Sequence, residues 1–335
     1  MEKSLFIRLR LLGDIVFTIP AVQLYLTQYP DHRITYLVEE EYAGAARLIP
    51  GIHEVAVVPR RMTLRDHLSF YKSVRAQRYD RVIDFHSGPK SALLTFLSGA
   101  PIRIGYRTPN RNWAFNRLTP RFVGSTPGHS VTNQVRLLEH VGIDAGHAAE
   151  KIPAYPPVSI PEPGSGPEIF ERVQDRPRVV VHLGAGNHFR DWGLDNFARL
   201  IECLLTQGHA PILIGHSEPE RERGTYLASR YPVIDLTGRL KIDQTLYVIA
   251  HSRAYVGIDS GPLHLASLTE TPIVALYGPN IPAVSGPWRR DRVTIVETRL
   301  SCRPCSQRRC RYDTIRCMKE IEVERVCRAV QDHLV

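Results

Sequence analysis

Three loops of the sequence place glycine beside a charged or hydroxyl side chain, directly after an apolar run. The first, at residues 11–20, contains Gly13 and Asp14. Glycine permits a sharp turn and the close approach of a ligand. An aspartate that faces a ligand there can act as a general base toward an attacking hydroxyl. The alternative is that Asp14 only caps the following helix, whose start Pro20 limits or kinks.

The second loop, residues 182–193, follows the apolar run VVVHL. Gly184 and Gly186 ahead of a helix would expose backbone N–H groups to a phosphate. Arg190 adds a permanent positive charge that can bind a diphosphate through two hydrogen bonds. Two glycines are too few for a dinucleotide fingerprint, and the sequence has no Walker A pattern. The alternative for Arg190 is a solvated loop residue.

The third loop, residues 257–266, gathers Asp259, Ser260, Gly261 and His264 at the start of a helix. Small residues at a helix N-terminus favour an anion, and an aspartate there can hydrogen-bond sugar hydroxyls. A serine hydrolase is not supported, because the GxSxG pattern is absent. The alternative is helix capping by one of the two polar residues, with a packed histidine.

A fourth candidate is Glu218, which follows an apolar run that ends in glycine. An acidic residue in such a place often holds ribose hydroxyls. Glu220 and Glu222 are equally well explained as surface charges.

The sequence contains no Asp-x-Asp, so a nucleotide-diphosphate site would not depend on a carboxylate-held divalent ion. Helix N-termini and Arg190 would meet the charge of the leaving phosphate, and we expect no required cofactor.

Four of the six cysteines lie within one short segment, at Cys302, Cys305, Cys310 and Cys317. Four thiolates suit zinc or iron, although only the first pair has zinc-knuckle spacing. A structural metal and free thiols (or a conditional disulfide) therefore both remain open. Cys203 and Cys327 stand apart, and in a reducing cytosol we expect no disulfide framework.

The chain is basic, with a formal net charge of +9 over 335 residues. Residues 289–328 hold twelve Lys or Arg against six acidic residues, but no interleaved aromatics and no finger pattern. We therefore expect a solvated or membrane-facing surface there and no nucleic-acid partner. Arg60, Arg61 and Arg65 follow the third apolar run; they would either hold an anionic acceptor or form an ordinary surface.

These loops need a scaffold of buried strands. Apolar, β-branched runs recur along the chain and are nearly continuous rather than alternating, which is typical of parallel strands buried on both faces. Amphipathic stretches separate them, one at residues 15–26 and another after Asp195, a plausible N-cap. The predicted strands are 5–9, 34–38, 55–58, 82–85, 179–183, 212–215, 233–236, 254–258 and 273–277. A final helix is expected at about 320–333.

Six prolines and two glycines in residues 152–167 predict a linker. We expect two doubly wound domains, 1–155 and 168–335, whose ligand loops lie at the carboxyl ends of the strands. No apolar run is long enough for a transmembrane helix, and the charged N-terminus is not a signal peptide. We expect a cytoplasmic protein whose contact with a membrane would be peripheral.

Several of these segments together resemble glycosyltransferase family 9, the heptosyltransferase family. LGDIVFTIPAVQLYLTQYP resembles its N-terminal signature, and DSGPLHLASLTETPIVALYGPNIPAVSGPW resembles its most specific C-terminal block. DFHSGPKSALLTFLSGAPIRIGY, GHSVTNQVRLLEHVGI and the cysteine-bearing CRPCSQRRCRYDTIRCMKEIEVERV match further segments in the same order. The match runs along nearly the whole chain.

The resemblance implies a GT-B fold, with two Rossmann-like domains whose parallel sheets face a central cleft. It implies an inverting transfer of heptose from ADP-heptose, bound by the C-terminal domain, to the lipopolysaccharide inner core, a Kdo or heptose acceptor at the cytoplasmic face of the inner membrane. Asp14 matches the family's catalytic base, and Glu218 the residue that holds the adenosine ribose. Arg190 stands where the family usually has a phosphate-binding lysine. The segment from Asp259 to His264 matches the donor motif. The alternatives are an epimerase or hydrolase on the same scaffold, or a member with another donor or acceptor.

Overall fold

The computed structural model describes residues 1–121, 128–144, 152–160, 176–184, 186–288, 291–312 and 314–334. The chain forms two compact units, Met1–Val158 and Ser159–Val335. The division between them falls inside the segment 152–167, where the sequence predicts a linker. The predicted start of the second domain, residue 168, lies outside the described residues.

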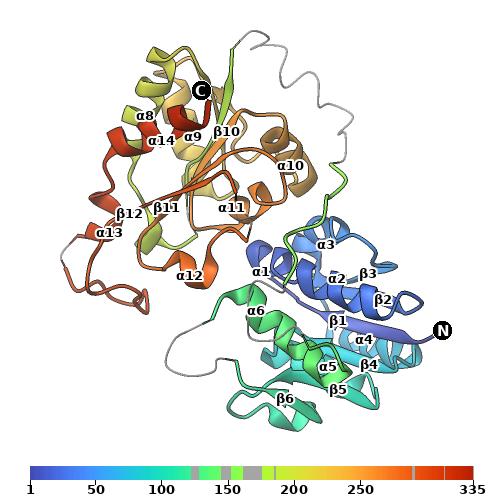
Figure 1. Cartoon of the computed structure of the whole chain (residues 1–335). Helices are drawn as coiled ribbons and strands as arrows, with labels where there is room; N and C mark the ends of the chain where they lie inside the picture. Colours follow the sequence, from blue (N-terminus) through green and yellow to red (C-terminus); the bar gives the residue numbers. More distant parts are fainter. Residues whose placement is uncertain are drawn as a thin grey trace. The chain divides into compact units, whose positions relative to one another are not determined.

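The first unit is built on a six-stranded sheet in the order β3-β2-β1-β4-β5-β6, in which every neighbouring pair is parallel (Figure 1). Its strands are β1 Lys3–Ile7, β2 Arg33–Glu39, β3 Glu54–Val58, β4 Arg81–Asp84, β5 Ile102–Tyr106 and β6 Arg117–Thr119. The last two strands were not predicted. Arg103 interrupts the apolar pattern of β5, and β6 is a three-residue edge strand, so neither shows a continuous apolar run.

Helices cover both faces of this sheet. They are α1 Leu12–Val16, α2 Ile19–Gln28, α3 Ala43–Arg47, α4 Leu64–Ala76, α5 Pro89–Leu97 and α6 Ser130–Val135, with 3-10 helices at Glu40–Tyr42, Asn112–Ala114 and Arg136–Val141. Helix α1 contacts α3, α2 contacts α6, and α4 contacts α5. The helix expected at residues 15–26 is two helices, because Pro20 occupies the first turn of α2, where its missing N–H costs nothing.

The second unit repeats the design with the order β12-β11-β10-β7-β8-β9, again all parallel. Its strands are β7 Arg178–His182, β8 Ala210–Ile214, β9 Ile234–Asp235, β10 Ala254–Ile258, β11 Ile273–Tyr277 and β12 Val293–Glu297. The unpredicted β12 is an edge strand that is only partly buried.

The helices of this unit are α8 Leu194–Thr206, α9 Glu218–Ala228, α10 Ile242–Ala250, α11 Gly261–Ala266, α12 Pro282–Ser285, α13 Arg316–Lys319 and α14 Val323–Leu334, with a 3-10 helix, η6, at His188–Arg190. The predicted N-cap at Asp195 is wrong. Helix α8 begins at Leu194 after Gly193, whose φ of 103° suits glycine, and Asp195 lies in the first turn. The predicted final helix is α14, preceded by the short α13.

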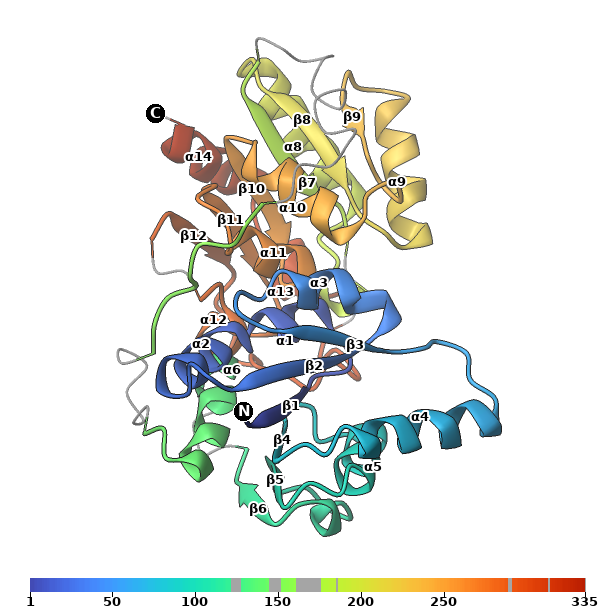
Figure 2. The ribbon, with the colours of Figure 1, turned by 90° about the vertical axis from the view of Figure 1, so that its right-hand side faces the viewer.

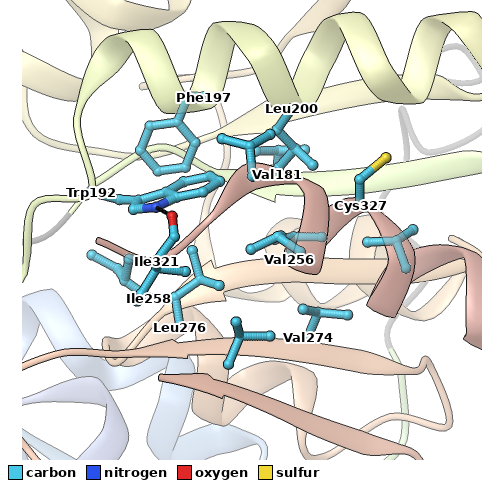
Figure 3. Packing of buried hydrophobic residues seen from close by; sticks show 14 of the residues in the cluster. Val181, Trp192, Phe197, Leu200, Val256, Ile258, Val274, Leu276, Ile321 and Cys327 are labelled. Carbon is cyan, nitrogen blue, oxygen red and sulfur yellow. Dashed lines mark hydrogen bonds between the residues drawn. The ribbon is translucent and has the colours of Figure 1, made fainter. Parts of the chain in front are cut away.

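One apolar layer fills the space between this sheet and the helices α8 and α14 (Figure 3). Trp192 is fully buried there and stacks edge-on against Phe197, while its indole N–H donates to the carbonyl of Ile321 at 3.0 Å. Trp192 lies two residues after Arg190. The ring therefore anchors the loop after β7 to the core of the unit.

The same layer contains a disulfide that contradicts the sequence expectation. Cys203 of α8 and Cys327 of α14 are bonded, with their Cα atoms 6.5 Å apart. The two residues are 124 positions apart in the chain, so their spacing gave no sign of the pairing. The bond ties the last helix to the helix that follows β7.

Both sheets have the strand order of a doubly wound α/β fold, which confirms the predicted fold class. In such a sheet the connections turn in opposite directions from one point, and the loops on either side part there. That point lies between β1 and β4 in the first unit and between β7 and β10 in the second. The loops after these four strands are therefore the expected ligand loops.

Candidate active site

In the first unit, Asp14 lies in α1, just beyond the carboxyl end of β1. Its Oδ2 accepts a hydrogen bond from Arg8, a guanidinium that is only 4% exposed and that also donates to the carbonyl of Phe85 at 2.8 Å. Helix α1 has no side-chain cap, so the capping alternative for Asp14 is wrong. The side chain of Asp14 is 27% exposed. Arg8 thus fixes one carboxylate oxygen and leaves the group open to solvent.

The loop after β4 closes the other side of this switch point. Buried Asp84 accepts the backbone N–H groups of His86 and Ser87 at 2.9 and 2.7 Å. Burial raises the pKa of Asp84 to about 6, although these hydrogen bonds oppose the shift. Burial and the charges of Arg8 and two further arginines lower the pKa of His86 to about 3, so its imidazole is neutral at pH 7. Sequence reasoning missed Arg8, Asp84 and His86; a buried polar group at a strand end was the only signal.

Arg60, Arg61 and Arg65 all lie on the surface of the first unit. The first two precede α4, and the third is in its first turn, behind a capping box formed by Thr63 and Asp66. Figure 2 shows α4 at the end of an extended loop from the edge strand β3. These cations are accessible, but they follow an edge strand rather than the switch point.

In the second unit, Asp259 and Arg190 meet at the switch point between β7 and β10. Asp259 is 4% exposed. Arg190 Nη1 donates to its carbonyl at 2.8 Å and lies 3.4 Å from Oδ2. Burial on its own would raise the pKa of Asp259, but hydrogen bonding from His264 and the charge of Arg190 hold it below its usual value. Arg190 is therefore held by protein contacts and is not a solvated loop arginine.

Two amide side chains connect this pair with the cysteine segment. Asn280 donates to Asp259 Oδ2 at 2.5 Å, and its own oxygen accepts from Gln307 at 2.5 Å. Gln307 Oε1 accepts from Arg190 Nε at 3.0 Å and from Asn187 at 2.8 Å. Gln307 lies between Cys305 and Cys310, so the cysteine segment contributes directly to the order of the site. Sequence reasoning did not find Gln307 or Asn280.

Ser260 belongs to a second polar network. Its hydroxyl lies 3.2 Å from Nδ1 of His182, the last residue of β7, and Nε2 of that histidine lies 3.1 Å from Oε1 of Glu220. Ser260 also donates to the carbonyl of Ile258 at 3.1 Å and makes no capping hydrogen bond to α11. The alternative interpretation, in which Ser260 caps the helix, is therefore wrong. The order serine, histidine, carboxylate matches a hydrolase triad, but the nucleophile elbow is absent.

Glu220 is 7% exposed, so its interpretation as a surface charge is wrong. Its carboxylate occupies space that two glycines leave open: a Cβ on Gly184 would lie 2.3 Å from the Glu220 side chain, and one on Gly215 would lie 2.6 Å away. Residue 184 must therefore be glycine to make room for the Glu220 side chain, whether or not a ligand also approaches it. A Cβ on Gly186 would meet no atom within 4 Å, so the backbone there is open to a ligand.

The remaining predicted residues lie around the same strand ends. Glu218 is the first residue of α9, after β8; its carboxylate is 69% exposed and pairs with Arg221. Gly261 opens α11 and is partly exposed. His264 is 4% exposed, with Nε2 3.8 Å from Oδ1 of Asp259.

The four clustered cysteines line one cavity with a volume of about 170 Å³, together with Phe189 and Arg303. All four are free thiols. Burial and the neighbouring thiols raise the pKa of Cys317 to about 11, against the opposing charge of Arg303. Among the described residues, no three His, Cys, Asp or Glu side chains are arranged to hold a metal ion. A structural metal at this cluster stays a prediction.

Comparison with known proteins identifies the family. The model of glycosyltransferase family 9 (heptosyltransferase) matches residues 67–316. This chain belongs to that family. It is therefore a glycosyltransferase, and the polar groups at the switch point of each unit are candidate active-site residues of a family 9 enzyme.

Individual relatives are distant but span nearly the whole chain. Lipopolysaccharide heptosyltransferase 1 of Pseudomonas aeruginosa is 27% identical over 92% of this chain and 88% of its own length. Lipopolysaccharide heptosyltransferase 3 of Escherichia coli is 23% identical over 85% and 86%. Among solved structures, E. coli ADP-heptose lipopolysaccharide heptosyltransferase II superposes with a TM-score of 0.83 at 21% identity, covering 100% of this chain and 98% of its own. The fold of this family 9 enzyme is thus GT-B.

The buried carboxyl of Asp84 predicts a pH dependence of stability. Its folded pKa of about 6 exceeds the ordinary value of 3.8, so the folded state binds more protons between these values and loses stability as pH rises through them. Between pH 4 and pH 7 we expect the wild type to lose roughly 1–3 kcal/mol relative to Asp84→Asn. Urea unfolding at each pH measures this. A pH-independent difference, or an equal effect of exposed Asp31→Asn, would contradict it.

The cysteine chemistry predicts an order of thiol reactivity. At pH 8, without reductant, we expect exposed Cys305 to react with a thiol reagent first and Cys317 last, because its thiol is buried and little ionised. Cys203 and Cys327 should react only after reduction. Peptide mass spectrometry identifies each site. Protection of all four clustered thiols until a chelator is added would instead show that they hold a metal.

Proposed function

We propose that this family 9 glycosyltransferase moves heptose from ADP-heptose to the inner core of lipopolysaccharide, with inversion at the anomeric carbon. Relatives along almost the whole chain are named lipopolysaccharide heptosyltransferases. The observation that carries the proposal is the pairing of Arg190 with buried Asp259 at the switch point of the second unit. A guanidinium can meet a diphosphate there, beside a carboxylate that can accept hydrogen bonds from sugar hydroxyls.

We assign the donor to the second unit. Arg190 and Ser260 would bind the diphosphate, and Gly186 and Gly261 would allow its close approach, with Gly184 keeping the loop open around Glu220. Asp259, backed by His264, would hold the sugar. Glu218, which is exposed at the carboxyl end of β8, would hold the ribose hydroxyls. In this assignment the leaving ADP is stabilised by protein groups, and no cofactor takes part.

We assign the acceptor to the first unit. Asp14 would remove the proton from the attacking hydroxyl as ADP leaves from the opposite face of the sugar. Its Oδ2 is held by Arg8, so Oδ1 is the oxygen available to act as the base. Arg60, Arg61 and Arg65 would hold the negative groups of a lipopolysaccharide acceptor through exposed guanidinium groups.

We also propose that the enzyme works at the cytoplasmic face of the inner membrane. In the parts of the chain that the structure describes, no helix is long and apolar enough to span a bilayer. Helix α4 offers a peripheral contact instead. Leu64 and Leu68, 85% and 61% exposed, lie one turn apart on the same face. Five cations and one carboxylate occur between residues 59 and 76, a combination that suits an anionic lipid surface.

The base assignment is tested with Asp14→Asn. We expect kcat to fall by about 10²–10⁴-fold, the usual contribution of a general base, while the affinity for ADP stays unchanged. Product analysis with and without acceptor separates transfer from hydrolysis or epimerisation. Exposed Asp31→Asn is the matched control and should keep full activity. Nearly wild-type turnover by a folded Asp14→Asn protein would remove Asp14 from this role.

The donor assignment is tested with thermal shifts. Wild-type protein should be stabilised more by ADP-heptose than by UDP- or GDP-sugars. At equal concentration, the ligand that binds the folded state more tightly raises the unfolding temperature more. Arg190→Ala should weaken ADP binding by about 10–100-fold, the value of a charge-assisted hydrogen bond. An unchanged affinity for ADP in this variant would contradict the diphosphate assignment.

The membrane contact predicts lipid-dependent sedimentation. Wild-type protein should bind vesicles that contain phosphatidylglycerol and should not bind vesicles of phosphatidylcholine alone. Added salt should weaken the binding. Leu64→Ser with Leu68→Ser should reduce binding about tenfold while activity on a soluble acceptor is kept, because the leucines insert and do not hold sugar. Tyr226→Ser, at an exposed aromatic residue of the second unit, is the control. Equal binding by the leucine variant would reject α4 as the contact.

A further inference from the structure

Ser260, His182 and Glu220 form a buried polar network. Glu220 makes one contact in it that the cap of helix α9 does not need. Glu220 Oε2 already accepts the backbone N–H groups of His216 and Ser217 at 2.8 and 2.7 Å, as well as the Ser217 hydroxyl. These contacts complete the capping box of α9. Oε1 is the oxygen that faces His182, at 3.1 Å. The contact with the histidine is thus an addition to the cap.

This addition has a structural cost. The glutamate side chain fits only because residues 184 and 215 lack a Cβ, and glycine in a strand-end position loses more conformational entropy on folding than other residues do. His182 is 3% exposed, so both of its ring nitrogens depend on protein partners rather than on bulk water. His182 ends β7, Ser260 follows β10, and Glu220 lies in the first turn of α9, which follows β8; these three strands are adjacent in the sheet.

The protons in this chain of contacts are limited by valence. Burial on its own would raise the pKa of Glu220, but hydrogen bonding with His182 and with Ser217 holds it well below its ordinary value. Ionised Glu220 accepts only, so Nε2 of His182 must carry a proton. Ser260 Oγ donates its single proton to the Ile258 carbonyl at 3.1 Å, so in its 3.2 Å contact with Nδ1 of His182 the hydroxyl oxygen can only accept.

We propose that Glu220 and His182 are positioning residues that hold Ser260 Oγ as an acceptor, so that its single proton can turn from the Ile258 carbonyl to an oxygen of the donor diphosphate. This role rests on the proposed function. Glu220, His182 and Ser260 then form one line of hydrogen bonds that ends at the leaving group. A hydroxyl whose oxygen already accepts a hydrogen bond makes a stronger hydrogen bond through its own proton.

The step at which negative charge develops on the leaving phosphate decides whether kcat or KM depends on this network. The negative charge on the phosphate grows as the bond to the sugar breaks, so the hydrogen bond from Ser260 is stronger in the transition state than in the ground state. Interactions of that kind raise kcat more than they lower KM. A residue that only supports the fold would change stability and leave this ratio alone.

The test is a double-mutant cycle on the full chain, with ADP-heptose as the donor. His182→Gln removes the contact at Nδ1, and we expect kcat to fall about 10–100-fold, as for other residues that orient a ligand group, with little change in KM. His182→Asn places an amide near the Nδ1 position and should restore most of this loss. In a Ser260→Ala background, His182→Gln should cost nothing further, since it acts only through the hydroxyl.

Glu220→Gln gives an independent arm, because it keeps the shape of the side chain and removes its charge. We expect a kcat loss of the same size, again absent in the Ser260→Ala background. Ser252→Ala is the matched control: this buried serine donates to Val248 at 2.7 Å in α10 and should keep full kcat. Thermal unfolding of each variant identifies any that fail to fold.

The outcomes separate the two claims. An active wild-type enzyme in which the His182 and Ser260 effects add, or in which only KM changes, overturns the positioning role. Failure of His182→Asn to recover kcat in a folded protein does the same. A wild-type protein that neither binds ADP nor consumes ADP-heptose overturns the proposed function, and with it this role of Ser260.

Discussion

Asp259 is a carboxylate that the fold keeps charged although it is almost completely buried, and the second unit is organised around that constraint. A buried charge costs several kcal/mol unless it is paired and hydrogen-bonded. Arg190, Asn280 and His264 supply the compensation. Each comes from a different loop, so the loops after β7, β10 and β11 are held together by the need to satisfy one group. The same need fixes the guanidinium that can meet a phosphate.

In the first unit the buried charge is a cation rather than a carboxylate. Arg8 is a nearly buried cation at the end of β1, and it is paired with the side chain of Asp14 and the carbonyl of Phe85. That pairing connects the loop after β1 with the loop after β4 across the switch point. In each unit, therefore, an ion pair of one partly exposed and one buried partner marks the place where the strand connections part.

The basic, cysteine-bearing segment near the C-terminus has a structural part in the site. Gln307 in this segment holds Arg190 and Asn280, and the four thiols line the cavity beside it. The segment thus packs against the candidate donor site through Gln307. This contact argues against treating the segment as a separate binding module.

The sequence by itself determined the α/β class, nine of the strands and the positions of the loops after them, because long apolar runs and glycine-containing strand ends are local signals. Family membership followed from the order of such segments. It did not determine that Glu220 is buried, that Gly184 makes room for it, or that Ser260 contacts His182. It also missed β5, β6 and β12, whose patterns are short or mixed, and the bond between Cys203 and Cys327. These features join residues far apart in the chain, and only tertiary packing brings parallel strand ends close enough for their polar groups to share protons.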